Sequence, residues 1–136
     1  MENFPLSVLK PRHAILSGEP HHASLQILLI PFFWKSELVD TSIQLDGIDL
    51  PSIHLSDLAD RSFNFPLNPD ENAIDGSIYL DSSHHPVDVS SIGFVRSRHD
   101  GLKVLIKGTY VFEFERLDQY SNTPFNLGIS VSTCVV

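Results

Sequence analysis

The sequence predicts an all-β protein, either an antiparallel β-sandwich or a partly open β-barrel with at most one short helix. Three observations lead to this fold class. Segments in which apolar residues alternate with polar ones follow one another along the chain, helical periodicity is nearly absent, and turn signals recur roughly every ten residues. No repeat or shift in composition divides the chain, so residues 1–136 are expected to form a single domain.

The composition is that of a folded protein that needs no disulfide or metal cross-link for stability. It has 136 residues, 42% of them hydrophobic, which is enough for a real core. The longest apolar run, residues 27–34, is interrupted by Pro31 and is far shorter than the roughly 20 residues of a membrane span. The opening residues show no apolar signal region, and the one cysteine, Cys134, suits a reducing compartment. We therefore expect a cytoplasmic protein with an inert thiol.

Residues 87–115 give the strongest local prediction, a hairpin of two long strands. Asp100-Gly101 readily adopts the positive φ angles of a two-residue type I′ turn. The facing pairs that this turn predicts include His99/Leu102, Val95/Ile106, Val89/Phe112 and Asp88/Glu113. One face of the hairpin then carries Val, Ile, Phe and Tyr side chains and is expected to be core, while the other face is mixed.

The rest of the chain supplies further strands in order. They are expected over residues 13–17, 22–34, 38–45, 48–50, 77–80 and 125–136. Asp46-Gly47 predicts a second hairpin turn, and Ser56 could cap a single helical turn. Residues 63–75 and 81–86 are expected to be polar loops, the first of them long enough to carry function.

Charge points to a protein partner rather than to nucleic acid. Seventeen acidic residues against nine basic ones give a formal charge of −8, which opposes phosphate binding and suits a basic protein, although solubility alone would also explain it. The candidate binding residues lie in the predicted loops and on the polar face of the hairpin: Asp70, Glu71, Asp75, His84, His85, Asp88, Glu113 and Glu115.

Among these candidates, Asp88 and Glu113 are the pair that most clearly indicates a binding site. Like charges that face each other destabilise a sheet, so this pair would need a cation, a partner's Lys or Arg, or water. Charged edge strands that block aggregation give the structural alternative. At least one of the contiguous aromatics at 32–34 must point away from the other two, and a single exposed aromatic could anchor a partner. Core packing of these aromatics on both faces of the strand is the favoured expectation.

Motifs for catalysis are missing from the sequence. It contains no GxSxG elbow, no glycine-rich phosphate loop and no HxH or HExxH spacing. Of the seven histidines, four form the adjacent pairs at 21–22 and 84–85, and neighbours on a strand point to opposite faces. We therefore expect no catalytic residues, no metal and no cofactor. A metal-dependent or carbohydrate-binding β-sandwich protein that uses the histidines stays open as an alternative, as does an accessory protein that oligomerises through sheet edges.

Residues 79–89, YLDSSHHPVDV, followed by Phe94, Gly108 and the FEFE run at 112–115, resemble small uncharacterised bacterial proteins with an HxPVD[VL] loop and an FxFE strand. The likeness covers about 40 residues of the hairpin region. Some of those proteins are regarded as immunity proteins of toxin systems. The resemblance implies a stoichiometric inhibitor of a toxin domain, often a basic nuclease. Together with the charge, it makes a non-enzymatic protein-binding module the first expectation.

Overall fold

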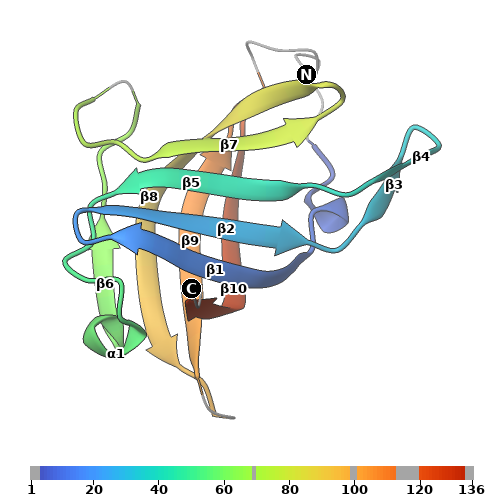
Figure 1. Cartoon of the computed structure of the whole chain (residues 1–136). Helices are drawn as coiled ribbons and strands as arrows, with labels where there is room; N and C mark the ends of the chain where they lie inside the picture. Colours follow the sequence, from blue (N-terminus) through green and yellow to red (C-terminus); the bar gives the residue numbers. More distant parts are fainter. Residues whose placement is uncertain (1–3, 69, 99–100, 113–119, 134–136) are drawn as a thin grey trace.

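Seven strands close into a β-barrel in the computed structural model, which describes residues 4–68, 70–98, 101–112 and 120–133 (Figure 1). The barrel strands are β1 (Pro11–Glu19), β2 (His22–Leu29), β5 (Ser42–Ile48), β7 (Asp75–Leu80), β8 (Ser83–Arg96), β9 (Leu102–Tyr110) and β10 (Thr123–Thr133). They follow one another around the barrel in the order β8-β7-β5-β2-β1-β10-β9, and β9 pairs back onto β8. The all-β prediction is confirmed. The sandwich is wrong, and the barrel is closed rather than partly open.

One pairing of the barrel is parallel, which the sequence did not predict. Strand β1 lies parallel to β10, with Ala14 opposite Val131, and all the other pairings are antiparallel. Because this contact joins the two ends of the described chain, no local hairpin pattern reports it. The parallel pairing closes the barrel and corrects the purely antiparallel expectation.

In the described part of the chain, five further elements lie outside the seven barrel strands. They are a 3-10 turn, η1 (Leu6–Val8), the short strands β3 (Phe32–Trp34) and β4 (Glu37–Val39), one helical turn, α1 (Leu55–Leu58), and the strand β6 (Arg61–Asn64). Strands β3 and β4 pair only with each other, whereas β6 pairs with the second half of β8. The helical turn begins at Leu55 without a side-chain cap, so Ser56 does not play the capping role predicted for it.

Strand β8 closes the barrel because it changes neighbours along its length. Its first residues pair with β7, and from Val87 onward it pairs with β9. A glycine on β7 makes room for this departure: a Cβ atom on Gly76 would lie 2.3 Å from the carbonyl oxygen of Val87. Only glycine allows so close an approach of two backbones.

The barrel interior is filled by side chains, as expected of a small barrel. Alternate residues of each strand point inward, and these form one continuous apolar cluster. Its barrel members are Ala14, Leu16, Ala23, Leu25, Ile27, Leu29, Ile43, Leu45, Ile48, Ile78, Leu80, Val87, Val89, Ile92, Phe94, Leu102, Val104, Ile106, Tyr110, Phe125 and Val131. His85 and Thr123 are the buried polar side chains among the described residues.

The predicted hairpin exists, but its register is wrong. The last β8–β9 pair is Arg96 with Leu102 instead of His99 with Leu102, and Ser97 N donates to Gly101 O at 3.1 Å. A bulge then shifts the register between Val89 and Ser91. These two changes turn Ile92 and Phe94 into the core, and Asp88 faces Thr109 rather than Glu113.

Two other turn predictions are also corrected. Asp46-Gly47 makes no hairpin: β5 runs through it, and Gly47, at φ +65°, sits at a bulge where the β2–β5 register shifts. Asp81 and Ser82, both at positive φ, form the tight turn between β7 and β8. Residues 83–86, which were expected to continue a polar loop, therefore belong to strand β8.

Candidate protein-binding site

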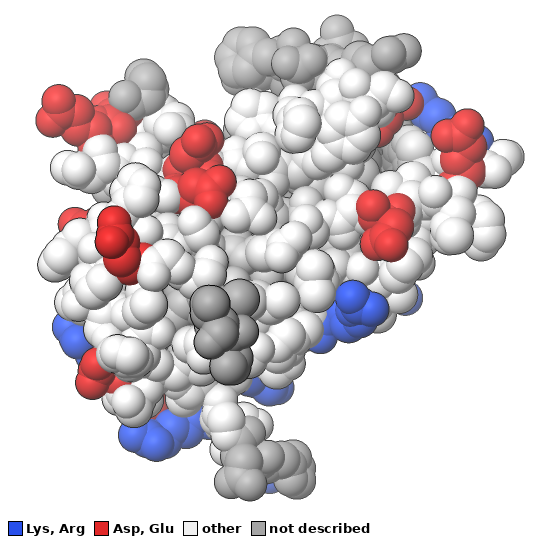
Figure 2. Space-filling model, viewed as in Figure 1, with Lys and Arg blue, Asp and Glu red and all other residues white. Residues whose placement is uncertain are grey.

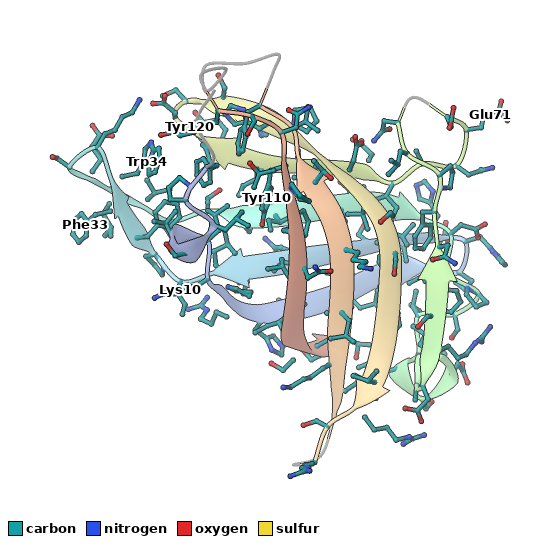
Figure 3. All side chains as sticks on the ribbon, turned by 180° about the vertical axis from the view of Figure 1, so that it is seen from behind. Lys10, Phe33, Trp34, Glu71, Tyr110 and Tyr120 are labelled. Carbon is teal, nitrogen blue, oxygen red and sulfur yellow. The ribbon has the colours of Figure 1, made fainter. Side chains whose placement is uncertain are left out.

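The ribbon of β3 and β4, hereafter the arm, projects from the barrel wall (Figure 1). In its register Phe33 faces Leu38, so both side chains lie on the same face of the ribbon. Phe33 is 73% exposed and Leu38 is 64% exposed. Phe32 and Trp34 point to the other face and pack against the core. The arm therefore presents an adjacent aromatic and aliphatic pair to the surroundings, and Figure 3 shows Phe33 at the outer edge of the molecule.

Aromatic stacking holds the root of the arm. Trp34 stacks on Phe4 with ring centroids 5.2 Å apart, and Tyr120 contacts both rings at 5.2 to 6.1 Å. Phe4 in turn stacks on Phe112, with centroids 4.9 Å apart, at the end of the barrel. Because Trp34 and Phe33 are neighbours in a strand, this anchoring fixes the direction in which the Phe33 side chain points.

A groove of about 390 Å³ lies between the arm and the β7–β8 turn. It is lined by Trp34, Lys35, Glu37, Leu38, Val39, Asp40, Thr41, Tyr79, Leu80, Asp81 and Ser82. Two contacts cross it: Lys35 Nζ lies 3.3 Å from Asp81 Oδ2, and Thr41 Oγ1 donates to the carbonyl oxygen of Tyr79 at 2.9 Å. Three carboxylates and one lysine line the groove, so its charge is negative.

A second acidic region lies where β1 and β5 end and β7 begins. Its carboxylates are Glu19, Asp46, Asp49, Asp70, Glu71 and Asp75. Asp46 and Asp75 face each other across β5 and β7, and Asp46 accepts hydrogen bonds from Ser24 Oγ and Gln44 Nε2. In Figure 2, acidic side chains lie on this side of the molecule and near the arm, while most of the visible Lys and Arg lie along the lower edge.

The structure disperses the acidic binding candidates. Glu71, and with it the loop of Asp70, lies at the opposite end of the molecule from Phe33 (Figure 3). Asp88 accepts a hydrogen bond of 2.7 Å from Asn68 Nδ2, so this carboxylate already has a polar partner within the chain. Glu113 and Glu115 lie outside the described residues. Asp88 faces Thr109, which differs from the predicted register with Glu113, and the carboxylates near the arm were not among the candidates.

The adjacent histidines of β8 have opposite environments. His85 points into the barrel, fully buried, where Nε2 donates to the carbonyl oxygen of Leu80 at 3.1 Å and the ring contacts Phe112 at 5.5 Å. Such a ring has no surface to offer a partner. His84 points outward, and its ring lies 5.0 Å from that of Tyr79, a residue of the groove. His84 is therefore the predicted residue that the fold brings beside the groove.

The other histidines that the structure describes do not converge. His13 hydrogen-bonds with Ser130 and Ser132 at 2.9 and 2.7 Å, and His21 Nδ1 lies 2.7 Å from Asp49 Oδ1. Within the described ranges, no three His, Cys, Asp or Glu side chains are grouped so that they could hold a metal ion. The alternative that relied on the histidines gains no shared site from this part of the chain.

The sequence did not predict the arm as a separate ribbon. Its signal was the aromatic run at Phe32–Trp34, in which one ring had to point away, followed by Lys35 and Ser36. These two residues have φ angles of +51° and +68°, so they form the tight turn of the ribbon. The run was assigned to a long core strand because nothing local shows that Pro31 ends β2 and starts a separate ribbon.

Comparison with protein-family models, with curated proteins and with solved structures finds no match to this chain. In the described residues, no helix has the length and apolar character that a membrane span requires. Any functional statement therefore has to come from the surface itself.

Proposed function

We propose that this protein is a non-enzymatic binding module that holds a basic protein partner with the arm. The observation that carries the proposal is the exposure of Phe33 beside Leu38, at 73% and 64%. Single exposed apolar residues are ordinary, but an adjacent aromatic and aliphatic pair on a projecting ribbon is costly in water. Aromatic anchors of this kind dominate the free energy of binding in protein interfaces.

Free strand edges support the same role. Each strand of the closed barrel has a neighbour on both sides, whereas β3 and β4 each have a single neighbour. An isolated two-stranded ribbon is marginally stable, and its unpaired N–H and C=O groups can pair with a strand from another chain. A partner strand added to the arm would bury Phe33 or Leu38 and satisfy those groups together.

Charge defines the chemistry of the partner. Glu37, Asp40 and Asp81 line the groove, and the one lysine there, Lys35, already pairs with Asp81. A surface with Lys or Arg around an apolar pocket complements this arrangement and would be steered toward it by the net charge of −8. A basic toxin domain met in the cytoplasm is such a partner, so inhibition of a toxin is the specific form of the proposal.

The test is association with the protein encoded beside this one. Both chains are co-expressed and purified, and their affinity is measured by calorimetry at low and high salt. We expect tight 1:1 association that weakens with salt, and a loss of about 100-fold or more in the Phe33→Ala/Leu38→Ala double variant, since truncating a hot-spot residue costs roughly 2 kcal/mol. Leu67→Ala, which truncates an exposed leucine outside the arm, is the matched control and should bind as wild type.

Two results would overturn the proposal. One is failure of the wild-type chain to bind any neighbouring gene product at micromolar concentration. The other is wild-type affinity in the Phe33→Ala/Leu38→Ala variant while it remains folded by circular dichroism. Because both side chains are exposed, their truncation should leave the free energy of unfolding almost unchanged. A loss of binding therefore reports the interface rather than the fold.

A further inference from the structure

A separate hollow of about 370 Å³ lies on the outer face of β8, β9 and β10, the face toward the viewer in Figure 3. It is lined by Ser62, Ser91, Gly93, Leu105, Ile106, Lys107, Asn126, Leu127 and Gly128. This volume lies in the range of small-molecule sites. None of these residues belongs to the arm or its groove.

The strand registers arrange this lining in two rows. In the first row Lys107 on β9 lies between Ser91 on β8 and Asn126 on β10. In the second, two residues along, Leu105 lies between Gly93 and Gly128. Neighbouring strands are about 4.8 Å apart, and alternate residues of one strand are about 7 Å apart. Three polar groups therefore span one end of the hollow, and a leucine flanked by glycines forms the other end.

The two glycines leave room for the side chains of Ser62 and Leu105, which line the hollow, to lie close against the sheet. A Cβ atom on Gly128 would lie 3.2 Å from Leu105 Cδ2, and one on Gly93 would lie 3.0 Å from Ser62 Oγ. Any larger side chain at these positions would occupy the space above the second row. Leu105 is 45% exposed on the outer face of the middle strand of the three.

The polar row consists of donors without an opposing acid. Lys107 is the charged residue of the lining, and no carboxylate lines the hollow, in a chain whose formal charge is −8. Within the described residues, the side chains of Ser91, Lys107 and Asn126 make no hydrogen bond or ion pair with one another or with any other side chain. Ammonium, amide and hydroxyl groups in one row suit the two oxygens of a carboxylate.

We propose that this hollow binds a small carboxylic acid anion with a short alkyl chain. The carboxylate accepts from Lys107, Ser91 and Asn126, and the alkyl chain lies on Leu105 between the two glycines. The spacing of about 7 Å between the rows fits an alkyl chain of about four to six carbons. This ligand site is independent of the arm, so it stands or falls separately from the proposed partner.

The test is titration of the ¹⁵N-labelled full chain, at constant ionic strength, with sodium hexanoate, sodium acetate, 1-hexanol and inorganic phosphate. We expect saturable amide shifts at Gly93, Leu105 and Gly128 with hexanoate, and at least tenfold weaker binding of the other three. Lys107→Met, which keeps the alkyl stem, should weaken hexanoate binding at least tenfold. Lys103→Met is the matched control on the same face of β9, outside the lining, and should change the affinity less than twofold.

Each contrary outcome overturns the proposal in a different way. Equal binding of acetate or phosphate would show an attraction for anions only, and equal binding of hexanol would show an apolar surface only. Equal weakening by Lys107→Met and Lys103→Met would show a general charge effect. Gly128→Val fills the hollow and should abolish the shifts, while Lys107→Met keeps the test decisive if that variant does not fold.

Discussion

Tyr110 stacks on Phe125 inside the barrel, with ring centroids 4.3 Å apart, and its hydroxyl has no hydrogen-bond partner among the described residues. The ring is almost completely buried. A buried hydroxyl without a partner costs about 1–3 kcal/mol of desolvation. We therefore predict that Tyr110→Phe, which keeps the stacking, raises the free energy of unfolding by about 1 kcal/mol in urea denaturation at neutral pH. A loss of stability of that size would contradict the prediction, because it would mean that the hydroxyl is bonded in solution.

The same residue makes stability fall at alkaline pH. Burial raises the pKa of the Tyr110 hydroxyl well above its usual value, because the phenolate would be desolvated. In the unfolded chain the group loses its proton near pH 10, while in the folded chain it keeps it to higher pH. The unfolded state then binds fewer protons, so the stabilisation is complete below about pH 10 and falls by roughly 1.4 kcal/mol per pH unit above it.

Denaturation curves at pH 9 and pH 11 measure this effect as a difference between proteins. Wild type should lose more stability over this interval than Tyr110→Phe does. Tyr79→Phe removes a hydroxyl from a half-exposed ring and should follow wild type. Parallel behaviour of wild type and Tyr110→Phe would show that other groups cause the alkaline loss.

The adjacent pair His84 and His85 offers a direct contrast between surface and core. Replacing His85 by alanine removes its hydrogen bond to Leu80 O and its contact with Phe112, and leaves a cavity in the barrel. We predict that His85→Ala lowers the free energy of unfolding by about 2–4 kcal/mol. His84→Ala, one residue earlier and exposed, should change it by less than about 0.5 kcal/mol. Thermal or urea denaturation of the two variants decides between this assignment and equal roles at the surface.

The sequence predicted what depends on local pattern. Alternation identified most of the strands, and the alternate apolar residues of β2, Leu25, Ile27 and Leu29, lie in the core. Barrel closure escaped because it depends on the parallel contact of β1 with β10, residues more than a hundred positions apart. The hairpin register was not predicted because the pairing starts at Arg96 with Leu102 and shifts between Val89 and Ser91, and it is this register that places Ile92 and Phe94 in the core.

The candidate site was predicted even less completely, for a similar reason. Net charge indicated the class of partner, but which carboxylates meet depends on strand order. Asp88 accepts a hydrogen bond from Asn68, while Asp46 and Asp75, separated by 29 positions in the sequence, face each other. Likewise, only the three-dimensional placement of Phe4 and Tyr120 shows that Trp34 is held and Phe33 is left outside.

The Asp46–Asp75 pair yields the last prediction. Asp46 is partly shielded by Ser24 and Gln44, whereas Asp75 is exposed and has no hydrogen bond or ion pair to another described side chain. Like charges opposite each other cost a few tenths of a kcal/mol, up to about 1 kcal/mol. Asp75→Asn should therefore raise the free energy of unfolding by about 0.5 kcal/mol at roughly 0.01 M salt, and the gain should vanish near 1 M, where the Debye length falls to about 3 Å.

Asp70→Asn removes an exposed carboxylate that faces no other across a strand pair, and it is the control. A gain that persists unchanged in high salt, or an equal gain in Asp70→Asn, would mean that overall charge rather than this cross-strand pair sets the effect.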